Sequence, residues 1–397
     1  RSWDRLGPAS AASRTCPHQS VPMSSPVSDP TTGLVAGPVA GPATSPIRVA
    51  HLLEQCWHRV PGGTAVAAVG LARALHARSD VEVTGFRAHH RAGPPDHLDA
   101  GVPTVASRLP RSVLYESWHR LRRPVVDRLV GHPDLVHATG GAVPATGLPL
   151  VATIHDLAWR HYPEGATQRG RRMFEAWLSD ARRADRVVCP SEATRLDLLR
   201  AGFADNQVVV VPLGADPVAA APDRAAALRA RHGLDGPVVL WVGTVEPRKN
   251  LPALASALAS LDLDGLTLVV VGPTGWREDL AAAIAPLGDR VVVTGPVDEA
   301  TKHAWFDAAD VFCFPSLLEG FGLPVLEAMG HGTPVVTSAG TATEEVVGDA
   351  GLTVDPTDVD GLADAVRRVL GDSDLAARLG AAGRFRAATM TWAATAE

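Results

Sequence analysis

The most informative stretch of this chain reads Phe314-Pro-Ser-Leu-Leu-Glu-Gly-Phe-Gly-Leu-Pro-Val-Leu-Glu-Ala-Met329. The apolar run that ends at Phe314 predicts a buried strand, and the Gly-Phe-Gly triplet predicts a tight loop. The apolar residues after the loop predict a helix with Pro324 at its first position, where a missing N–H costs nothing. Such a loop directs backbone N–H groups and the positive end of the helix dipole at one point. The segment therefore predicts an anion site at the carboxyl end of a strand.

Two carboxylates flank this loop. We expect Glu319 at the strand end and Glu327 in the first turn of the helix, so that both line one crevice. A diphosphate on the N–H groups, with carboxylates nearby to accept sugar hydroxyls, fits a nucleotide-sugar. Taken alone, Glu327 could only complement the helix dipole and Glu319 could be a solvated loop acid. The Gly-Phe-Gly-Leu-Pro spacing between them favours the ligand site.

The rest of the chain alternates short apolar runs with longer amphipathic ones, a pattern typical of parallel sheets with helices on both faces. Strands are predicted at 47–53, 81–86, 135–138, 150–154, 187–189, 208–211, 237–242, 266–271, 291–294, 311–314 and 334–337. Helices are predicted at 64–78, 112–130, 169–183, 191–200, 251–261, 278–287 and 359–370.

An Ala/Pro stretch at 216–222 divides these elements into two series of similar length. We therefore predict two facing, doubly wound parallel-sheet α/β domains, at 46–218 and 219–384. Ligands of such sheets bind outside the carboxyl ends of the strands, and the two domains would form a cleft there. Residues 1–45 are rich in Pro, Ser, Ala and Gly and predict a disordered tail, within which Met23 is a candidate start.

Charge and composition argue against two kinds of partner, nucleic acid and the interior of a membrane. The 397 residues carry a net charge of −6, which with the lack of aromatic-interleaved basic strands argues against nucleic acid. No apolar run reaches the roughly 20 residues that a membrane span requires. The four cysteines, Cys16, Cys56, Cys189 and Cys313, show no metal-ligand spacing. These features fit a cytoplasmic protein, with Cys189 and Cys313 as buried thiols.

Basic residues are almost all arginine, since only Lys249 and Lys302 among the 37 are lysine. Arginines concentrate at 108–128 and 169–186. A basic face of this kind can attract an anionic membrane surface or an acidic acceptor. The plainer interpretation, an arginine-for-lysine bias on ordinary solvated helices, is the one we favour.

The motif Glu246-Pro-Arg-Lys-Asn250 follows the first strand of the second domain and precedes a helix. Arg248 can grip a phosphate bidentately, and Lys249 can act on it as a point charge. A basic loop at a helix start is the alternative, but cations there oppose the helix dipole unless an anion is bound. The motif therefore predicts a diphosphate site.

Two weaker motifs fall after strands of the first domain. Gly62 and Gly63 open a helix and let its backbone approach a ligand closely. His155 and Asp156 end another strand, which places them at the cleft. A lone His is more often structural than catalytic, and its place beside Asp156 at a strand end favours a functional role.

Three further residues fit helix starts. Ser191 follows a proline and predicts an N-cap. Glu344 and Glu345 precede an apolar run and fit a helix start or the cleft equally well.

These motifs together resemble the retaining glycosyltransferases of family four, whose two facing Rossmann-like domains form the GT-B fold. The resemblance runs from about Ile47 to the end of the chain. The Glu-x7-Glu segment and Glu-Pro-Arg-Lys-Asn-Leu are its most specific matches. Ile-His-Asp-Leu, Cys-Pro-Ser-Glu-Ala-Thr and Val-Val-Pro-Leu-Gly-Ala-Asp support it.

The resemblance implies a nucleotide-sugar donor bound mainly by the second domain. Glu327 would hold the ribose hydroxyls and Glu319 hydroxyls of the donor sugar, while His155 would lie beside the transferred sugar. Arg248 and Lys249 would take the diphosphate. The remaining donor contacts would come from backbone, at Gly62, Gly63, Val297, Gly320, Phe321, Gly322 and Leu323.

The resemblance also implies the reaction. The family retains the anomeric configuration, a front-face mechanism is the usual proposal, and neither a metal nor another cofactor is expected. The acceptor would be a hydroxyl of a glycan or lipid-linked intermediate, and residues 155–159 (His-Asp-Leu-Ala-Trp) favour mannosyl transfer from GDP-mannose. Family members usually continue with a helix that crosses back onto the first domain, so residues 385–397 are expected to start such a segment, cut short here.

Three other classes share parts of this architecture. A pyridoxal-phosphate-dependent glycan phosphorylase needs a Schiff-base lysine, and only Lys249 and Lys302 exist. A sugar-nucleotide epimerase would lack the Glu-x7-Glu loop. A non-catalytic sugar-nucleotide-binding protein would have little reason to keep both glutamates, the cation pair and His155 together.

Overall fold

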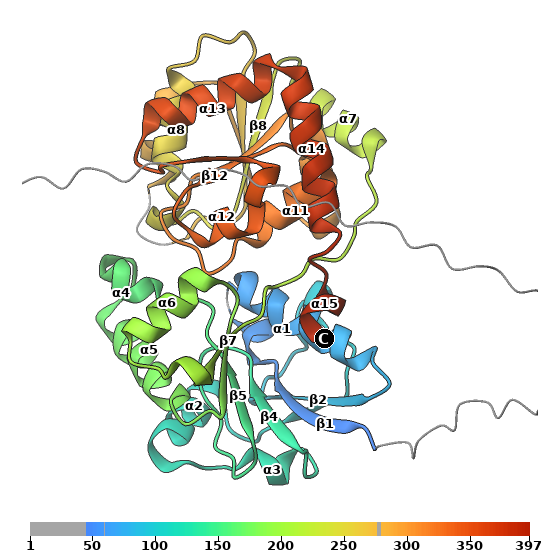
Figure 1. Cartoon of the computed structure of the whole chain (residues 1–397), viewed down its shortest axis with the longest axis vertical. Helices are drawn as coiled ribbons and strands as arrows, with labels where there is room; N and C mark the ends of the chain where they lie inside the picture. Colours follow the sequence, from blue (N-terminus) through green and yellow to red (C-terminus); the bar gives the residue numbers. More distant parts are fainter. Residues whose placement is uncertain (1–44, 59, 276–278) are drawn as a thin grey trace, which may run out of the picture. The chain divides into compact units, whose positions relative to one another are not determined.

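The computed structural model describes residues 45–58, 60–275 and 279–397 (Figure 1). Met23, Cys16 and all but the last residue of the tail predicted over 1–45 lie outside the described residues. The described chain forms two parallel sheets, each flanked by helices. The predicted fold class, two doubly wound α/β domains, is thereby confirmed.

The first sheet has seven strands in the order β3-β2-β1-β4-β5-β6-β7. Its strands are β1 (Ile47–Leu52), β2 (Val81–Arg87), β3 (Thr104–Ala106), β4 (Leu135–Ala138), β5 (Leu150–Thr153), β6 (Arg186–Cys189) and β7 (Val208–Val210). The helices that accompany it are α1 (Gly62–His76), α2 (Arg111–Leu121), α3 (Val126–Leu129), α4 (Ala158–His161), α5 (Gln168–Ala181) and α6 (Glu192–Arg200).

The second sheet has six strands in the order β10-β9-β8-β11-β12-β13. Its strands are β8 (Val238–Val242), β9 (Thr267–Val271), β10 (Val291–Gly295), β11 (Val311–Phe314), β12 (Val335–Ser338) and β13 (Leu352–Val354). The later helices are α7 (Pro222–His232), α8 (Leu251–Ala259), α9 (Leu280–Ile284), α10 (Glu299–Ala308), α11 (Leu323–His331), α12 (Ala342–Val347), α13 (Val359–Gly371), α14 (Ser373–Ala387) and α15 (Trp392–Ala396).

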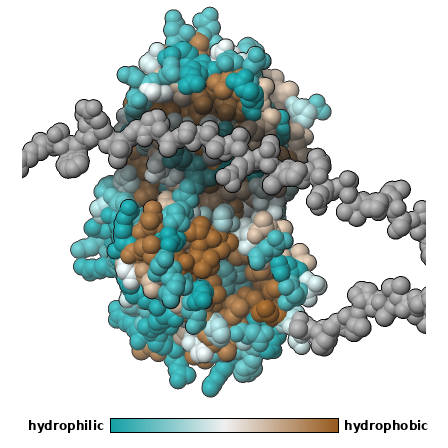
Figure 2. All heavy atoms as spheres, viewed as in Figure 1, coloured by the Kyte–Doolittle hydropathy of each residue, from teal (hydrophilic) through white to brown (hydrophobic). Residues whose placement is uncertain are grey.

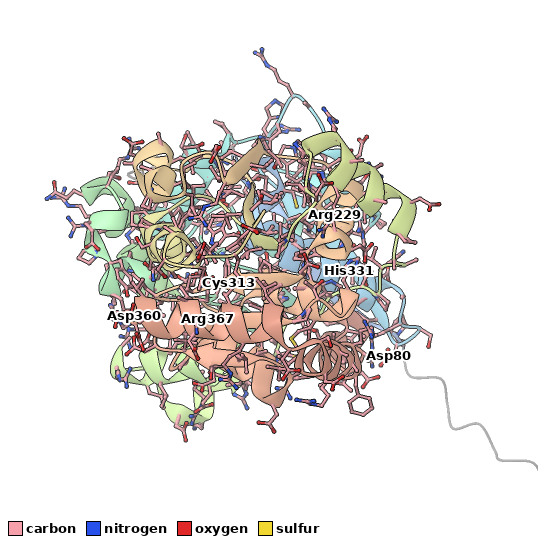
Figure 3. The ribbon with its side chains drawn as sticks, turned by 90° about the horizontal axis from the view of Figure 1, so that it is seen from above. Asp80, Arg229, Cys313, His331, Asp360 and Arg367 are labelled. Carbon is pink, nitrogen blue, oxygen red and sulfur yellow. The ribbon has the colours of Figure 1, made fainter. Side chains whose placement is uncertain are left out.

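The central strands of the second sheet show why continuous apolar runs in the sequence predicted strands correctly. Every residue of β8 and β11 is buried, because helices cover both faces of a parallel sheet. Cys313 lies inside β11 (Figure 3), and burial raises the pKa of its thiol. Cys56, Cys189 and Cys313 are free and buried, which confirms the two predicted buried thiols. On the outside, Figure 2 shows hydrophilic side chains along the margins of one face, with hydrophobic patches between them.

All eleven predicted strands are present, but several details were wrong. The helix predicted at 112–130 is broken into α2 and α3, because Arg122 adopts a left-handed conformation (φ 54°) and Pro124 cannot continue the helix. The short strands β3 and β13 were not predicted, since three residues carry too little periodicity. The helix predicted at 278–287 starts outside the described residues, and its described part is α9 followed by a 3-10 turn.

The start of α11 also differs from the prediction. Leu323 is the first helical residue, so Pro324 occupies the second position, which also lacks an intrahelical N–H partner. Glu327 is the fifth residue and belongs to the second turn, and the first turn carries no acid. The prediction placed Glu327 in the first turn because it took Pro324 as the first helical residue, whereas the helix starts one residue earlier, after its N-cap Gly322.

The chain passes twice between the sheets. The first passage follows β7 and leads to α7, which packs on α10. The second follows α14, which packs on α11 and extends through Ala387, past the boundary predicted at residue 385. Residues 388–391 then lead to α15, which packs against α1 (Figure 1).

A close contact between α15 and α1 fixes this return. Trp392 is 5% exposed, and a Cβ atom added at Gly70 of α1 would lie 2.3 Å from its Cε2 atom. Real Cβ atoms essentially never come so close, so the indole ring occupies space that only glycine leaves free. Thr395 Oγ1 also donates to the Pro212 carbonyl at 2.9 Å.

We expect Gly70→Ala to displace α15 and to expose the C-terminal segment, which limited proteolysis would detect. Trp392→Ala removes the same contact and should cost about 3–5 kcal/mol if the helix stays folded on α1. The double variant should be more stable than the two single costs predict, because the clash and the ring vanish together. Gly371→Ala, which has no atom within 4 Å of the new Cβ, is the control. Additive losses in urea unfolding would contradict the contact.

Candidate active site

A cavity of about 490 Å³ lies at the carboxyl ends of β8 and β11, the point where the strand order of the second sheet reverses. Residues from the first domain, which follow β1 and β5, complete its wall. The structure places all twelve residues predicted for the site in this lining: Gly62, Gly63, His155, Arg248, Lys249, Val297, Glu319, Gly320, Phe321, Gly322, Leu323 and Glu327.

The loop before α11 forms one pole of the cavity. Gly322 caps the helix with φ 111°, a conformation that L side chains rarely adopt, and this bend turns the chain into the helix. The first helical hydrogen bond runs from the Val325 amide to the Gly322 carbonyl. The amides of Gly322 and Leu323 precede it and lie at the positive end of the helix dipole. This pole suits a phosphate group.

A buried ion-pair cluster lines the same cavity. Glu319 accepts from Lys249 Nζ at 2.5 Å, and its other oxygen lies 3.2 Å from Arg248 Nη1. Ser316 Oγ donates to the first oxygen at 2.6 Å, and Arg248 Nε pairs with Glu246 at 3.1 Å. The Lys249 and Glu319 side chains are only 10% and 8% exposed. These ion pairs therefore join the loop after β8 to the loop after β11 at the site.

The cluster determines the charge of Glu319. Burial alone would raise the pKa of its carboxyl, but the Lys249 ammonium and then the Arg248 guanidinium outweigh burial and hold that pKa at about 2. Burial lowers the pKa of Lys249, and the neighbouring Arg248 charge lowers it further. The ionised Glu319 carboxylate, 2.5 Å away, opposes both effects by favouring the charged ammonium. The site thus presents two cations to an incoming anion, each partly satisfied by Glu319.

The second glutamate has a cation of its own. Lys302 Nζ, from α10, lies 2.9 Å from Glu327 and 2.7 Å from Glu299. Ligand atoms of Glu299, His303 and Glu327 lie within 4.8 Å of one another, a spacing that a metal ion could use. In this structure the Lys302 ammonium pairs with both carboxylates. Glu327 lines the cavity, and its carboxylate can accept hydrogen bonds from hydroxyl groups there.

His155 lies where the two domains touch. Its Nε2 lies 3.0 Å from the Thr139 carbonyl, so that nitrogen carries the proton and donates. Burial lowers the pKa of His155, which keeps the ring neutral at pH 7 and leaves Nδ1 as an acceptor. A Cβ added at Gly320 would lie 2.0 Å from the His155 carbonyl, so only glycine permits this approach.

The start of helix α6, in the first domain, also contacts Gly320. Ser191 is its N-cap, as predicted, accepting from the Thr194 amide, and its hydroxyl donates to the Gly320 carbonyl at 2.7 Å. Glu345 of α12 accepts from the amides of Glu192 and Ala193 at 2.7 and 2.8 Å. Glu345 therefore complements the start of a helix in the other domain, while Glu344 accepts from the Gly340 amide near its own helix.

Three lining or supporting residues were not assigned a role from the sequence. Lys302 was visible as one of only two lysines, but its distance of 25 positions from Glu327 gave no sign that they meet. Glu246 lies in the quoted Glu-Pro-Arg-Lys motif and pairs with Arg248. Ser316 follows β11 by two residues, and only the folded loop shows that it supports Glu319.

Comparisons with known proteins assign this architecture. Residues 236–372 match the family described as "Glycosyl transferases group 1", and residues 61–219 match "Glycosyltransferase Family 4". The chain belongs to glycosyltransferase family 4. It is 32% identical over 383 residues to a D-inositol 3-phosphate glycosyltransferase of Xylanimonas cellulosilytica, a match that covers 83% of this chain and 88% of that relative.

Two further similarities concern a relative and a solved structure. An O-antigen chain mannosyltransferase B of Escherichia coli is 30% identical over 253 residues, covering 61% of this chain and 66% of that protein. The structure of Anabaena HepE in complex with UDP-glucose superimposes with a TM-score of 0.69 at 20% identity, covering 88% of this chain and 97% of that one. This similarity confirms the GT-B fold of this family 4 glycosyltransferase.

The ion-pair cluster predicts a pH dependence of folding. Glu319 has a pKa of about 2 when folded, against an ordinary value of 4.5, so its stabilisation is complete above the unfolded value. As pH falls from about 4.5 toward 2, wild type should lose about 1.4 kcal/mol per pH unit relative to Glu319→Gln, or about 3 kcal/mol in all. Urea unfolding at several pH values measures this difference. Asp364→Asn, at a pair that is 51% exposed, is the control. Parallel profiles for wild type and Glu319→Gln would show that the cluster is not formed.

Proposed function

We propose that this glycosyltransferase moves a hexosyl group from a nucleoside-diphosphate sugar to a hydroxyl of a glycan or glycolipid. We further propose that it retains the anomeric configuration and needs no metal ion. The observation that carries the proposal is one cavity that contains a buried Arg–Lys pair, the amide pole of α11 and the Glu327 carboxylate. Together these groups match the diphosphate and the sugar hydroxyls of such a donor.

The cluster suggests how the leaving group is stabilised. In the free protein, Glu319 satisfies Lys249 and Arg248. A diphosphate at the amide pole would draw these cations toward its oxygens and let Glu319 accept a sugar hydroxyl instead. As the bond to the anomeric carbon breaks, charge develops on the phosphate oxygen, and fixed cations in a buried site stabilise it. The departing phosphate can then take the proton of the acceptor hydroxyl on the same face.

For the donor we propose GDP-mannose. The O-antigen mannosyltransferase relative supports a mannosyl group. HepE, solved with UDP-glucose, shares the fold, so a uridine donor is the outcome to test against. Val297 lines the cavity on the side of β10, where backbone groups would contact the base. The non-catalytic and epimerase alternatives both bind a sugar nucleotide, but neither would form a new glycosidic bond.

Nucleotide binding tests the site. In EDTA, one of GDP, UDP or ADP at 100 times its dissociation constant should stabilise the protein by about 2.7 kcal/mol, visible as a raised melting temperature. Glu327→Ala should lose most of that shift, because no carboxylate remains for the ribose. Asp364→Ala removes a carboxylate on α13, the helix marked by Arg367 in Figure 3, and should bind like wild type.

Transfer activity tests the mechanism. Lys249→Ala should reduce transfer by at least about 100-fold, the usual effect of removing one group that stabilises developing charge. Glu327→Ala should also abolish most transfer, because the donor loses its ribose contact. Nuclear magnetic resonance of the product would report the anomeric configuration. Near wild-type turnover in either variant would refute the site, and an inverted product would refute the retaining mechanism.

Beside the arginine-for-lysine bias favoured above, we propose a test of the second hypothesis, that the arginine-rich helices contact an anionic membrane surface. No helix in the described part of the chain is long and apolar enough to cross a bilayer, so contact would be peripheral. Arg122 lies 3.2 Å from the buried Asp180 and serves the fold, whereas Arg169 and Arg172 of α5 are exposed.

Charge reversal at the exposed positions separates these roles. Arg169→Glu/Arg172→Glu should lower the partitioning of the protein onto anionic liposomes by about 10-fold or more, at about 1 kcal/mol per basic residue. Neutral liposomes and high salt are the controls. Unchanged partitioning would leave the arginines as ordinary solvated residues.

A further inference from the structure

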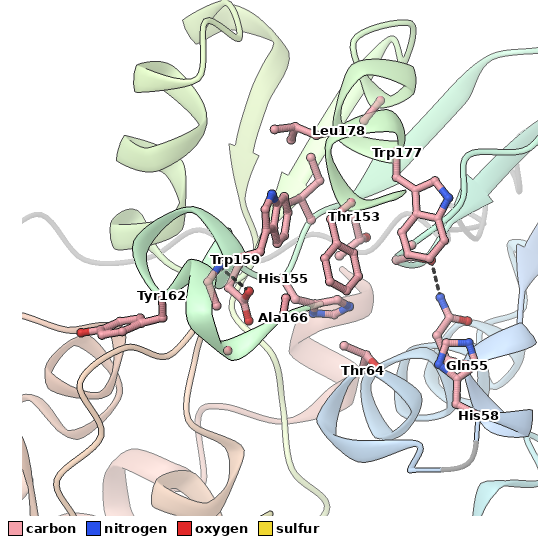
Figure 4. Close-up of a pocket in the computed structure, with 18 of the residues that line it drawn as sticks. Gln55, His58, Thr64, Thr153, His155, Trp159, Tyr162, Ala166, Trp177 and Leu178 are labelled. Atoms are coloured by element: carbon pink, nitrogen blue, oxygen red, sulfur yellow. Dashed lines mark hydrogen bonds between the residues drawn. The ribbon is translucent and has the colours of Figure 1, made fainter. Parts of the chain in front are cut away.

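A second cavity, of about 400 Å³, opens beside the first and is lined mostly by the first domain, with residues 246–248 of the second domain completing its wall (Figure 4). Aromatic side chains from α4, α5 and the loop between them form much of its wall: Trp159, Tyr162, Phe174 and Trp177. The Phe174 ring centroid lies 5.0 Å from that of Trp159 and 5.6 Å from that of Trp177. Ala138, Val143, Ala152 and Leu178 add aliphatic surface. Such a lining favours an apolar ligand surface.

Two polar atoms in this lining lack partners among the described residues. The Gln55 amide group donates to the Gly140 carbonyl at 2.6 Å, which fixes its orientation and leaves Oε1 unpaired. His58 Nε2 is likewise buried and unpaired, and burial followed by the Arg111 charge lowers the pKa of that ring to about 4. Gln55 is only 3% exposed. Buried polar atoms are nearly always paired, so both point to hydroxyl groups of a ligand.

The charges around the cavity exclude an anionic ligand. The histidines in this lining are neutral, so among the described residues that line the cavity Arg248 is the only cation. Arg248 already pairs with Glu246 and Glu319. Asp156, Glu164 and Glu246 add negative charge to the wall. A phosphorylated acceptor would meet more carboxylates than cations here, so the ligand that fits is uncharged.

The two cavities share a wall. His155, Asp156, Glu246 and Arg248 line both, together with Thr64 near the start of α1. A hydroxyl group that enters from the aromatic side would therefore meet the donor sugar beside His155, next to the diphosphate site. The second cavity thus lies where an acceptor must approach.

We propose that the acceptor of this enzyme is an uncharged, hydroxyl-bearing molecule that carries an alkyl or aromatic group. The apolar group fills the cavity between Trp159, Phe174 and Trp177, and hydroxyl groups pair with Gln55 Oε1 and His58 Nε2. This inference rests on the proposed transferase function, since it identifies the substrate on the other side of the same reaction.

Alkyl glycosides test the apolar subsite without knowledge of the natural sugar. Methyl, butyl, hexyl and octyl glucosides and mannosides, kept below their micelle concentrations, would be titrated against the nucleotide-bound protein by calorimetry. Each methylene that enters the cavity should tighten binding by about fourfold. A phenyl glycoside series distinguishes a planar aglycone from a chain: the better-binding series identifies which apolar group the cavity takes.

Substitutions in the lining test which residues form the apolar subsite. Trp177→Ala and Phe174→Ala should flatten the dependence on chain length, while Met173→Ala, exposed on the same helix, should leave it unchanged. Gln55→Met should weaken every member of the series by a similar factor, because it removes the hydroxyl partner and keeps the shape. The nucleotide-induced rise in melting temperature, if kept, shows that a variant is folded.

The outcomes are distinguishable from those that test the proposed function. If nucleotide binds but methyl and octyl glycosides bind equally, or Trp177→Ala keeps the chain-length dependence, the apolar subsite is wrong and the transferase site stands. If the dependence on chain length is present but no nucleotide binds, the cavity takes apolar ligands and the transferase proposal fails. Transfer onto an octyl glycoside in preference to its methyl counterpart would support both.

Discussion

The buried carboxylate of Glu319 is the group on which the rest of the site depends. Lys249 and Arg248 are largely removed from water, and an uncompensated buried cation costs several kcal/mol. Glu319 meets that cost in the free protein by pairing with both cations. The same contact holds the loop after β8 against the loop after β11, so the cation pair and the amide groups at the start of α11 keep a fixed position relative to one another. A diphosphate that replaces Glu319 would therefore bind to groups that are already in place.

A second constraint acts between the domains, and backbone atoms supply it. Gly320 lies against the His155 carbonyl so closely that any side chain there would collide. Ser191 and Glu345 add hydrogen bonds across the same boundary, and each of them also satisfies the start of α6. The position of His155 relative to the phosphate pole is therefore set by contacts that tolerate little change. Helix α15, seated on α1 through Trp392, holds the chain to the first domain at a separate point.

The sequence predicted the parts of this arrangement that are local. Buried parallel strands such as β11 read as continuous apolar runs, and the glycines and prolines beside them mark where ligand loops begin. Parallel topology then brings strand ends together, which is why the twelve predicted site residues meet in one cavity. Two features that were missed depend on long-range packing, the Lys302–Glu327 pair and the inter-domain role of Glu345, and neither produces a periodic or spacing signal in the chain. The break at Arg122 is local, and Pro124 within the predicted helix was its signal.

The two cavities divide recognition between two kinds of chemistry. The donor side relies on paired charges and backbone amides, which suit a diphosphate and discriminate little between bases or sugars. The aromatic side has few charges, and its unpaired Gln55 and His58 atoms add direction to an otherwise apolar surface. An acceptor that lacks the matching hydroxyls would leave these buried atoms unsatisfied, a stronger penalty than a lost methylene contact. Specificity for the acceptor should therefore come chiefly from the first domain, while the second supplies the charge that makes transfer possible.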